Sequence, residues 1–268
     1  MKKALTYIIV FILVQIFVTY AVLASHAMLG GHPFMESLKM AVTAQIPATA
    51  TLLIVTSAIY SLILLVLFLA AKWCEVSPTY LRARPWGVLL WAAVLALGML
   101  IPSEVAQEIL PLPDLMGKEM AQVLSSRWGY LTICIFAPLV EEVVFRGAVL
   151  RSLLQRMDSR WGAIAMSALL FALVHLNPAQ MPHAFCVGLL LGWMYERTHS
   201  LLPGIMVHWI NNTAVYVVFN IFPNLPDTPI RSLYGDNWMK IGLCVLFSLF
   251  IFLPAIWQLN ARMKPAHR

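Results

Sequence analysis

The hydrophobic pattern of this chain consists of long apolar runs separated by short polar segments. The runs cover residues 4–24, 45–71, 86–101, 129–150, 161–176, 182–195, 201–221 and 238–259. Several of them approach the ~20 residues that a membrane-spanning helix needs, whereas 86–101, 161–176 and 182–195 are shorter. The pattern therefore predicts an all-α, polytopic bundle of about eight transmembrane helices, with a polar loop over 102–128.

Composition supports the same class of protein. Hydrophobic residues make up 61% of the chain and charged residues 11%, whereas soluble domains are roughly 45–50% apolar. So few charges cannot cover a water-facing surface. Because no repeat or long linker divides the sequence, residues 1–268 are expected to form a single membrane domain whose main partner is the lipid bilayer.

The basic residues predict the orientation of the bundle. With about eight spans, most Lys and Arg fall in the polar segments on the same side as the two termini. Basic residues concentrate on the cytoplasmic side of membrane proteins, so both termini are expected to be cytoplasmic. This distribution accounts for the net charge of +6 without a nucleic-acid partner, and none is expected.

Three charges interrupt the fourth apolar run, at Glu141, Glu142 and Arg146. An ionisable side chain near the bilayer centre costs roughly 2.5–3.5 kcal/mol, so such residues usually serve a function. Glu142 and Arg146 lie one helical turn apart and are expected to pair as structural support. Glu141 points about 100° away from Glu142 and has no cation nearby in sequence, which makes it the candidate general base. A proton-relay carboxylate in a transporter and a purely structural triad are the alternatives.

Two histidines and an asparagine recur in later runs with one-turn spacing. Phe171 precedes His175 by four residues, and His208 precedes Asn212 by four residues. Taken singly, His175 is typical of a structural or interfacial histidine, and the second pair is typical of interhelical hydrogen bonding. At about 1.5 Å per residue, however, Glu141, His175 and His208 all fall within the ~30 Å hydrocarbon layer, so we expect them to converge.

These residue types suit hydrolysis by an activated water. A buried glutamate can take a proton from water with the help of His175, while His208 and Asn212 donate hydrogen bonds to the oxyanion of an attacked carbonyl. No covalent nucleophile is required. The same side chains, Glu141, His175 and His208, are also an alternative ligand set for Zn²⁺ with water in the fourth position, although no HExxH spacing is present.

Three motifs in this order resemble a known family. EExxxR at 141–146, FxxxH at 171–175 and HxxxN at 208–212 are similar to those of the CAAX-protease and bacteriocin-processing (CPBP, or Abi) intramembrane glutamate endopeptidases. The resemblance covers about residues 125–221, which would form the protease core.

The resemblance implies a fold, a function and a site. It implies a multi-pass protein of the bacterial plasma membrane that cuts a protein or peptide substrate, either lipidated or carrying a membrane-embedded tail. It implies no cofactor, with Zn²⁺ as the alternative because such families were first described as metalloproteases. A non-catalytic membrane partner or bacteriocin-immunity protein of the same fold is the other alternative. The implied catalytic residues are Glu141, His175, His208 and Asn212, supported by Glu142, Arg146 and Phe171.

Overall fold

The computed structural model describes residues 2–76, 79–222 and 230–264, and the regular structure within these ranges is helical. The separate helices are α1 (Lys2–Leu29), α2 (Phe34–Val42), α3 (Ala50–Ala70), α4 (Thr79–Arg82), α5 (Trp86–Ile109), α6 (Gly117–Leu124), α10 (Arg160–Leu173), α11 (Met181–Thr198), α12 (Leu202–Ile221), α13 (Ile230–Leu233) and α14 (Trp238–Arg262). One further helix is continuous through α7 (Arg127–Gly129), the π-helical segment η1 (Tyr130–Phe136), α8 (Ala137–Glu141), the π-helical segment η2 (Glu142–Leu150) and α9 (Arg151–Leu154).

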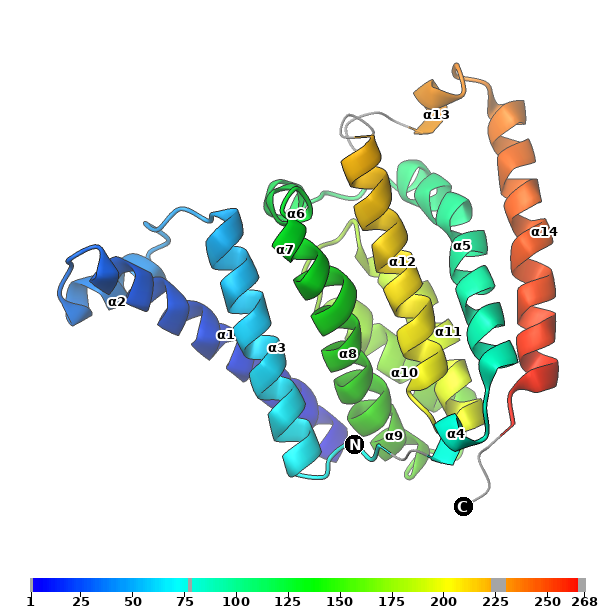
Figure 1. Cartoon of the computed structure of the whole chain (residues 1–268), viewed down its shortest axis with the longest axis horizontal. Helices are drawn as coiled ribbons and strands as arrows, with labels where there is room; N and C mark the ends of the chain where they lie inside the picture. The colour runs from blue at the N-terminus through cyan, green and yellow to red at the C-terminus, as the bar shows by residue number, and fades with distance from the viewer. Residues whose placement is uncertain (1, 77–78, 223–229, 265–268) are drawn as a thin grey trace.

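The all-α prediction is confirmed for the described residues. In the part of the chain that the structure describes, four helices, α1, α3, α5 and α14, are long and apolar enough to cross a membrane by themselves. α1 begins and α14 ends at the same edge of the molecule (Figure 1). The number of spans and the cytoplasmic side of the bundle stay predictions.

Two predicted boundaries are wrong. The run 86–101 continues as helix α5 to Ile109, because the residues after Pro102 favour a helix and Pro102 removes a single backbone donor. The polar stretch 102–128 is therefore helical at its start, and again in α6. The run 161–176 instead stops being helical at Leu173, so His175 lies in the turn that follows α10.

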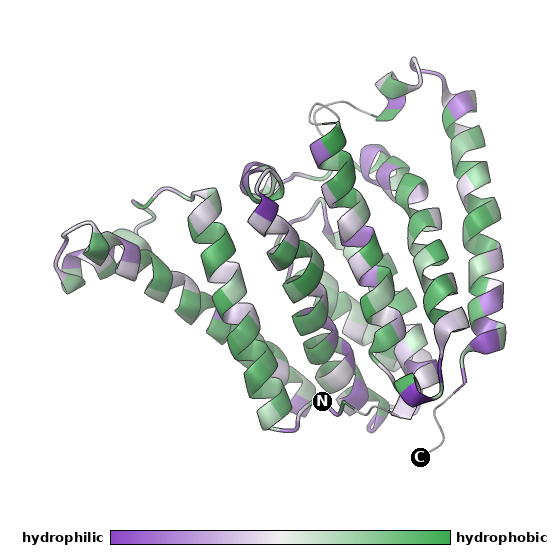
Figure 2. Cartoon of the chain, in the orientation of Figure 1, coloured by the Kyte–Doolittle hydropathy of each residue, from purple (hydrophilic) through white to green (hydrophobic). Residues whose placement is uncertain are grey.

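The helices are arranged around the continuous helix of residues 127–154. In Figure 1, α1, α2 and α3 lie on one side, α5 and α14 on the other, and α8 and α12 between them, with α10 and α11 behind. The most extensive helix–helix contacts are those of α5 with α14, α10 with α11, and α5 with α12. Hydrophobic residues cover the helix shafts, and many hydrophilic ones lie toward the helix ends (Figure 2). This distribution suits helices that span a bilayer.

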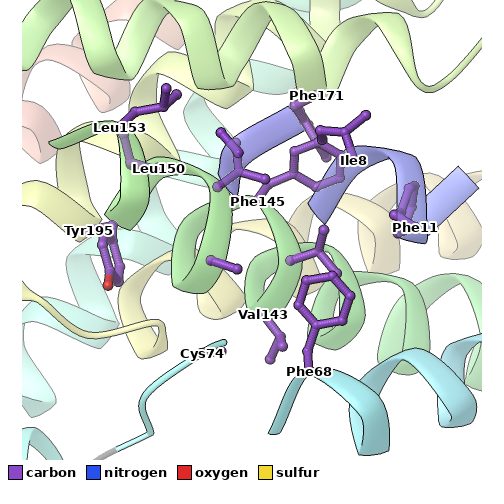
Figure 3. Close-up of a cluster of buried hydrophobic side chains, with 14 of the residues drawn as sticks. Ile8, Phe11, Phe68, Cys74, Val143, Phe145, Leu150, Leu153, Phe171 and Tyr195 are labelled. Atoms are coloured by element: carbon purple, nitrogen blue, oxygen red, sulfur yellow. The ribbon is translucent and has the colours of Figure 1, made fainter. Parts of the chain in front are cut away.

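Two buried apolar clusters hold these layers together. The first joins α1, α3, η2, α10 and α11 around Phe145 and Phe171, whose rings meet edge to face with centroids 5.1 Å apart (Figure 3). The second joins α5, α11, α12 and α14. A Cβ placed on Gly98 would lie 2.9 Å from the backbone nitrogen of Phe252, so a residue without a side chain permits the close approach of α5 and α14.

Candidate active site

The helix that carries the three charges contains two segments that are wound more loosely than an α-helix: η1, which precedes Glu141, and η2, which includes Glu142 and Arg146. The amide of Ala137 donates to the carbonyl of Thr132, and the amide of Arg151 donates to that of Arg146, in each case five residues back. Such widened turns advance each residue by a smaller angle and are frequent at functional sites.

Glu142 and Arg146 form a buried ion pair, as their spacing led us to expect. Arg146 Nη1 donates to Glu142 Oε1 at 2.8 Å, and the two side chains are 1% and 0% exposed. Arg146 Nη2 also donates to the carbonyl of Gly188 on α11 at 3.3 Å. A charge this deep requires a partner, because an unpaired buried ion costs several kcal/mol. The pair thus ties η2 to α11.

Phe171 connects this ion pair to both predicted histidines. The guanidinium carbon of Arg146 lies 4.4 Å from the centroid of the Phe171 ring. The ring of His175 meets Phe171 edge to face at 4.9 Å between centroids, and the ring of His208 does so at 6.0 Å. One aromatic side chain from α10 therefore packs against a buried cation and two imidazoles.

His208 lies between the two glutamates. Its Nε2 is 3.6 Å from Glu141 Oε2, and its Nδ1 is 3.5 Å from Glu142 Oε1. The side chain of Glu141 is 21% exposed and that of His208 is 9% exposed. Both separations exceed the usual length of a hydrogen bond, as is common for catalytic groups before substrate binds. The predicted convergence of Glu141 with His208 is therefore present in the structure.

Several polar atoms at this point lack a hydrogen-bond partner among the described residues. They include Glu141 Oε2, Glu142 Oε2, His208 Nδ1 and Asn211 Oδ1. More than nine-tenths of buried polar groups in proteins are hydrogen-bonded, so a cluster of exceptions indicates a site that binds water or a polar ligand. The atoms come from two elements that meet, the 127–154 helix and α12.

His175 is placed by the end of α10. Its Nδ1 lies 2.8 Å from the carbonyl oxygen of Phe171. A carbonyl can only accept, so Nδ1 carries the proton and a neutral His175 presents an unprotonated Nε2. Among the described residues, His175 makes no ion pair with Glu141; Phe171 links it to His208.

Asn212 contacts the loosely wound part of the neighbouring helix. Its Nδ2 donates to the carbonyl of Ile133 at 2.9 Å, and its Oδ1 accepts from Asn211 Nδ2 at 3.2 Å. An amide group has two donor hydrogens, so one remains after the bond to Ile133. The Asn211 side chain is the more buried of the two amides.

Three side chains near the site were not singled out from the sequence. His183, at the start of α11, interacts electrostatically with His208 and His175, and its Nδ1 is hydrogen-bonded to the hydroxyl of Ser103 on α5. Tyr60 on α3 interacts electrostatically with Glu141. His183 and Tyr60 belong to apolar runs and Ser103 to the predicted loop, so no local pattern distinguishes the three side chains. Helix packing alone brings them to the site.

The zinc alternative does not fit the arrangement of these residues. A zinc ion would require Glu141, His175 and His208 to surround one point at about 2.0–2.2 Å from each ligand atom. In the part of the chain that the structure describes, no group of three or more His, Cys, Asp or Glu side chains has a spacing that could hold a metal ion. The side chains that do meet are two glutamates and one histidine, with an arginine already paired to one of the glutamates.

Comparison with known proteins finds a family model that part of the chain resembles. A family model described as "Type II CAAX prenyl endopeptidase Rce1-like" matches residues 123–214, close to the predicted core of 125–221. No curated protein and no solved structure matches the chain. The matched family is one of proteases, and together with the four long apolar helices the match supports a protease that is an integral membrane protein. All three motifs lie inside the matched segment, so the resemblance is confirmed: residues 123–214 carry the sequence pattern of the Rce1-like, type II CAAX prenyl endopeptidases.

Proposed function

We propose that this protein is an intramembrane glutamate endopeptidase of the CPBP type. Its substrate is a membrane-associated protein or peptide, either lipidated or carrying a membrane-embedded tail. The protein resides in the bacterial plasma membrane as a bundle of about eight spans with cytoplasmic termini. It uses neither a nucleic-acid partner nor a cofactor, and the lack of a three-ligand cluster among the described residues weighs against zinc.

The observation that carries this proposal is the contact between Glu141 and His208. A partly exposed carboxylate faces a buried imidazole across 3.6 Å, beside polar atoms that lack a partner among the described residues. Glu142 is already paired with Arg146, so Glu141 is the carboxylate that remains for proton transfer. A proton-relay carboxylate in a transporter, or a structural triad, would not require one glutamate to be paired with Arg146 while the other remains for proton transfer.

The reaction that these groups support needs one water and no covalent enzyme intermediate. Glu141 removes a proton from the water as the water oxygen attacks the peptide carbonyl carbon, and a neutral His175 orients the water through its unprotonated Nε2. The carbonyl oxygen becomes an oxyanion that accepts from His208 and from the remaining donor of Asn212. When the carbon–nitrogen bond breaks, Glu141 returns its proton to the leaving amine. Glu142 and Arg146 keep the helix in place, and Phe171 keeps the two rings in place.

An apolar groove on the same helices that carry Glu141 and His208 supports a hydrophobic substrate. It encloses about 200 Å³ and is formed by α5, η1, α8 and α12. Ile205, Met206 and Trp209, which line it, lie within three residues of His208 on α12, and Pro138 and Leu139 lie three and two residues before Glu141. A chain lying in this groove would have apolar contacts next to the reacting groups.

Replacement of Glu141 by Gln tests the proposal. Glutamine keeps the shape of the side chain but cannot accept the proton, so cleavage by the purified protein should fall by at least ~100-fold. Glu119→Gln, at an exposed position of α6, is the matched control and should cleave as the wild type does. A comparison of shortened membrane proteins in cells carrying either variant would identify natural substrates. Equal turnover by the Glu141→Gln and wild-type proteins would refute the assignment.

A stability measurement separates the enzyme from a non-catalytic partner or immunity protein of the same fold. If Glu141 served packing, Glu141→Gln would lower the thermal midpoint. If Glu141 is a catalytic base next to unpartnered polar atoms, the same change should leave the midpoint unaltered or raise it. The second outcome, combined with lost cleavage, is the one that we expect.

A further inference from the structure

The turn that carries His175 is fastened to a distant segment of the chain. This turn, residues 174–180, connects α10 to α11, and the segment, residues 110–116, follows α5 and is called here the strap. Asn177 Nδ2 donates to Asp114 Oδ1 at 2.8 Å, and the amide of Leu115 donates to Asn177 Oδ1 at 3.1 Å. The amide of Ala179 donates to the carbonyl of Pro113 at 3.3 Å. Three hydrogen bonds thus join the strap to the turn.

Asn177 is the centre of this connection. Its side chain is fully buried, and both ends of its amide group are hydrogen-bonded to the strap. Asp114 also accepts from the amide of Met116 at 3.0 Å, which fixes the carboxylate that Asn177 binds. A buried amide with both halves satisfied defines one geometry, since loss of either partner leaves a buried polar group unpaired.

The backbone between His175 and Asn177 is strained. Leu176 has a φ of 51°, in the left-handed region that residues with a Cβ avoid. The Leu176 side chain is 68% exposed, so its packing does not compensate. Non-glycine residues persist in this conformation when the surrounding structure holds them there. The amide of Leu176 donates to the carbonyl of Leu173 at 3.2 Å, and the bonds of Asn177, the next residue, restrain the same turn from its other side.

The position of His175 depends on this turn. The hydrogen bond from Nδ1 to Phe171 directs the ring toward α10, but the backbone of His175 lies beyond the last residue of the helix. A relaxed turn would move that backbone and with it the unprotonated Nε2. Catalytic geometry is sensitive to such movement, since displacement by about 1 Å can cost ~100-fold in rate.

We propose that Asn177 and Asp114 are positioning residues that set His175 for catalysis by clamping its turn to the strap. The inference rests on the proposed function, because it gives His175 a role only in that reaction. It adds a part of the chain that the family match does not cover, since the strap precedes residue 123. The strap thereby becomes part of the catalytic apparatus without touching the substrate.

A swap of the two side chains tests the clamp. Asn177→Asp alone places two carboxylates against each other at a buried position and should break it. The double variant Asp114→Asn/Asn177→Asp restores one donor and one acceptor in the reverse order, while the bonds from Leu115 and Met116 still find acceptor oxygens. Asp114→Ala removes the hydrogen bond between Asn177 and Asp114 by changing the exposed partner, Asp114, and leaves Asn177 unaltered. Asn237→Asp, at the N-cap of α14 where Asp serves equally well, is the control for the chemical change.

Two measurements apply to each variant. Hydrogen–deuterium exchange of residues 110–116 and 174–180, which needs no substrate, should accelerate in Asn177→Asp and Asp114→Ala and return to the wild-type rate in the double variant. Cleavage of a prenylated CAAX peptide should show kcat reduced about 10- to 100-fold, with KM within about twofold, and recovered in the double variant. A purely structural role would lower the amount of folded protein and accelerate exchange throughout the chain, whereas a positioning role confines the faster exchange to residues 110–116 and 174–180.

The outcomes separate this inference from the proposed function. Unchanged exchange in both single variants would overturn the clamp. Faster exchange with unchanged kcat would overturn the positioning role while Glu141→Gln remains inactive. Wild-type turnover by Glu141→Gln would overturn the proposed function and the role of His175 together, whatever the exchange shows.

Discussion

The guanidinium of Arg146 lies over the ring of Phe171, with its central carbon 4.4 Å from the ring centroid. A cation stacked on an aromatic face in a buried setting gains about 2 kcal/mol. Arg146 Nη1 also donates to Glu142 Oε1 at 2.8 Å, so the guanidinium contacts both a carboxylate and an aromatic ring. Since Phe171 also contacts both imidazoles, its loss affects the ion pair and the histidines together.

Replacement of Phe171 by Leu should therefore lower both stability and cleavage. We expect a loss of about 2 kcal/mol from the cation–π contact, in addition to the lost apolar contacts. Phe145→Leu is the matched control, because Phe145 is buried in the same cluster and touches Phe171 but does not contact the cation. Chemical denaturation in detergent and peptide cleavage measure the two effects. Equal losses of activity in the two variants would remove the special role of Phe171.

Breaking the buried ion pair should be more damaging than removing both of its charges. Arg146→Met leaves Glu142 charged at a position that is 0% exposed, and loss of one partner of such a pair costs about 3–5 kcal/mol. The double variant Arg146→Met/Glu142→Gln contains no uncompensated charge and should recover part of that loss. Folded yield and thermal midpoint test this, and a double variant less stable than Arg146→Met would contradict it.

Two asparagines of α12, Asn212 and Asn220, each donate a side-chain hydrogen bond to a backbone carbonyl, but only Asn212 belongs to the predicted site. Asn212 donates to the carbonyl of Ile133 at 2.9 Å, and Asn220, two turns further, donates to that of Leu124 at 3.0 Å. If Asn212 also donates to the oxyanion, Asn212→Ala should reduce kcat about 100-fold, the usual cost of one such donor. Asn220→Ala should lower stability by a similar amount but leave kcat unchanged. The same kcat for both variants would remove Asn212 from the catalytic set.

Gly147 allows the chain before α4 to pass close to η2. A Cβ at this position would overlap the sulfur of Cys74, which is itself buried. Gly147→Ala should therefore destabilise the protein by about 1–3 kcal/mol through overpacking. Cys74→Ala in the same background should recover part of the loss, because it removes the sulfur. Gly242→Ala on α14 has nothing within 4 Å of the new Cβ and should be neutral or slightly stabilising when thermal midpoints are compared.

The motifs predicted the ion pair of the site because its two residues are close together in sequence. The pairing of Glu142 with Arg146 follows from one-turn spacing on one helix, and this spacing survives the widened turn of η2. The proximity of Glu141 to His208 was predicted from their depths in the bilayer, and Glu141 Oε2 lies 3.6 Å from His208 Nε2. Whether these residues catalyse a reaction stays a prediction for the Glu141→Gln experiment.

The sequence did not reveal contacts that depend on which helices become neighbours. Ser103 was placed in a loop, yet α5 continues past Pro102 and brings its hydroxyl to His183. The turn after Leu173 was expected to be helical, so the strained Leu176 and the clamp between Asn177 and Asp114 had no counterpart in the motif analysis.

Hydrophobic runs predicted that this chain is all-helical and spans a membrane, and one-turn spacings predicted the Glu142–Arg146 pair, because both are properties of a single helix. The three-dimensional structure was needed to show which polar atoms of the described residues lack hydrogen-bond partners and which segment clamps the turn of His175. These features arise from packing between helices far apart in the chain, where side-chain volume and backbone approach set the contacts and no local period encodes them.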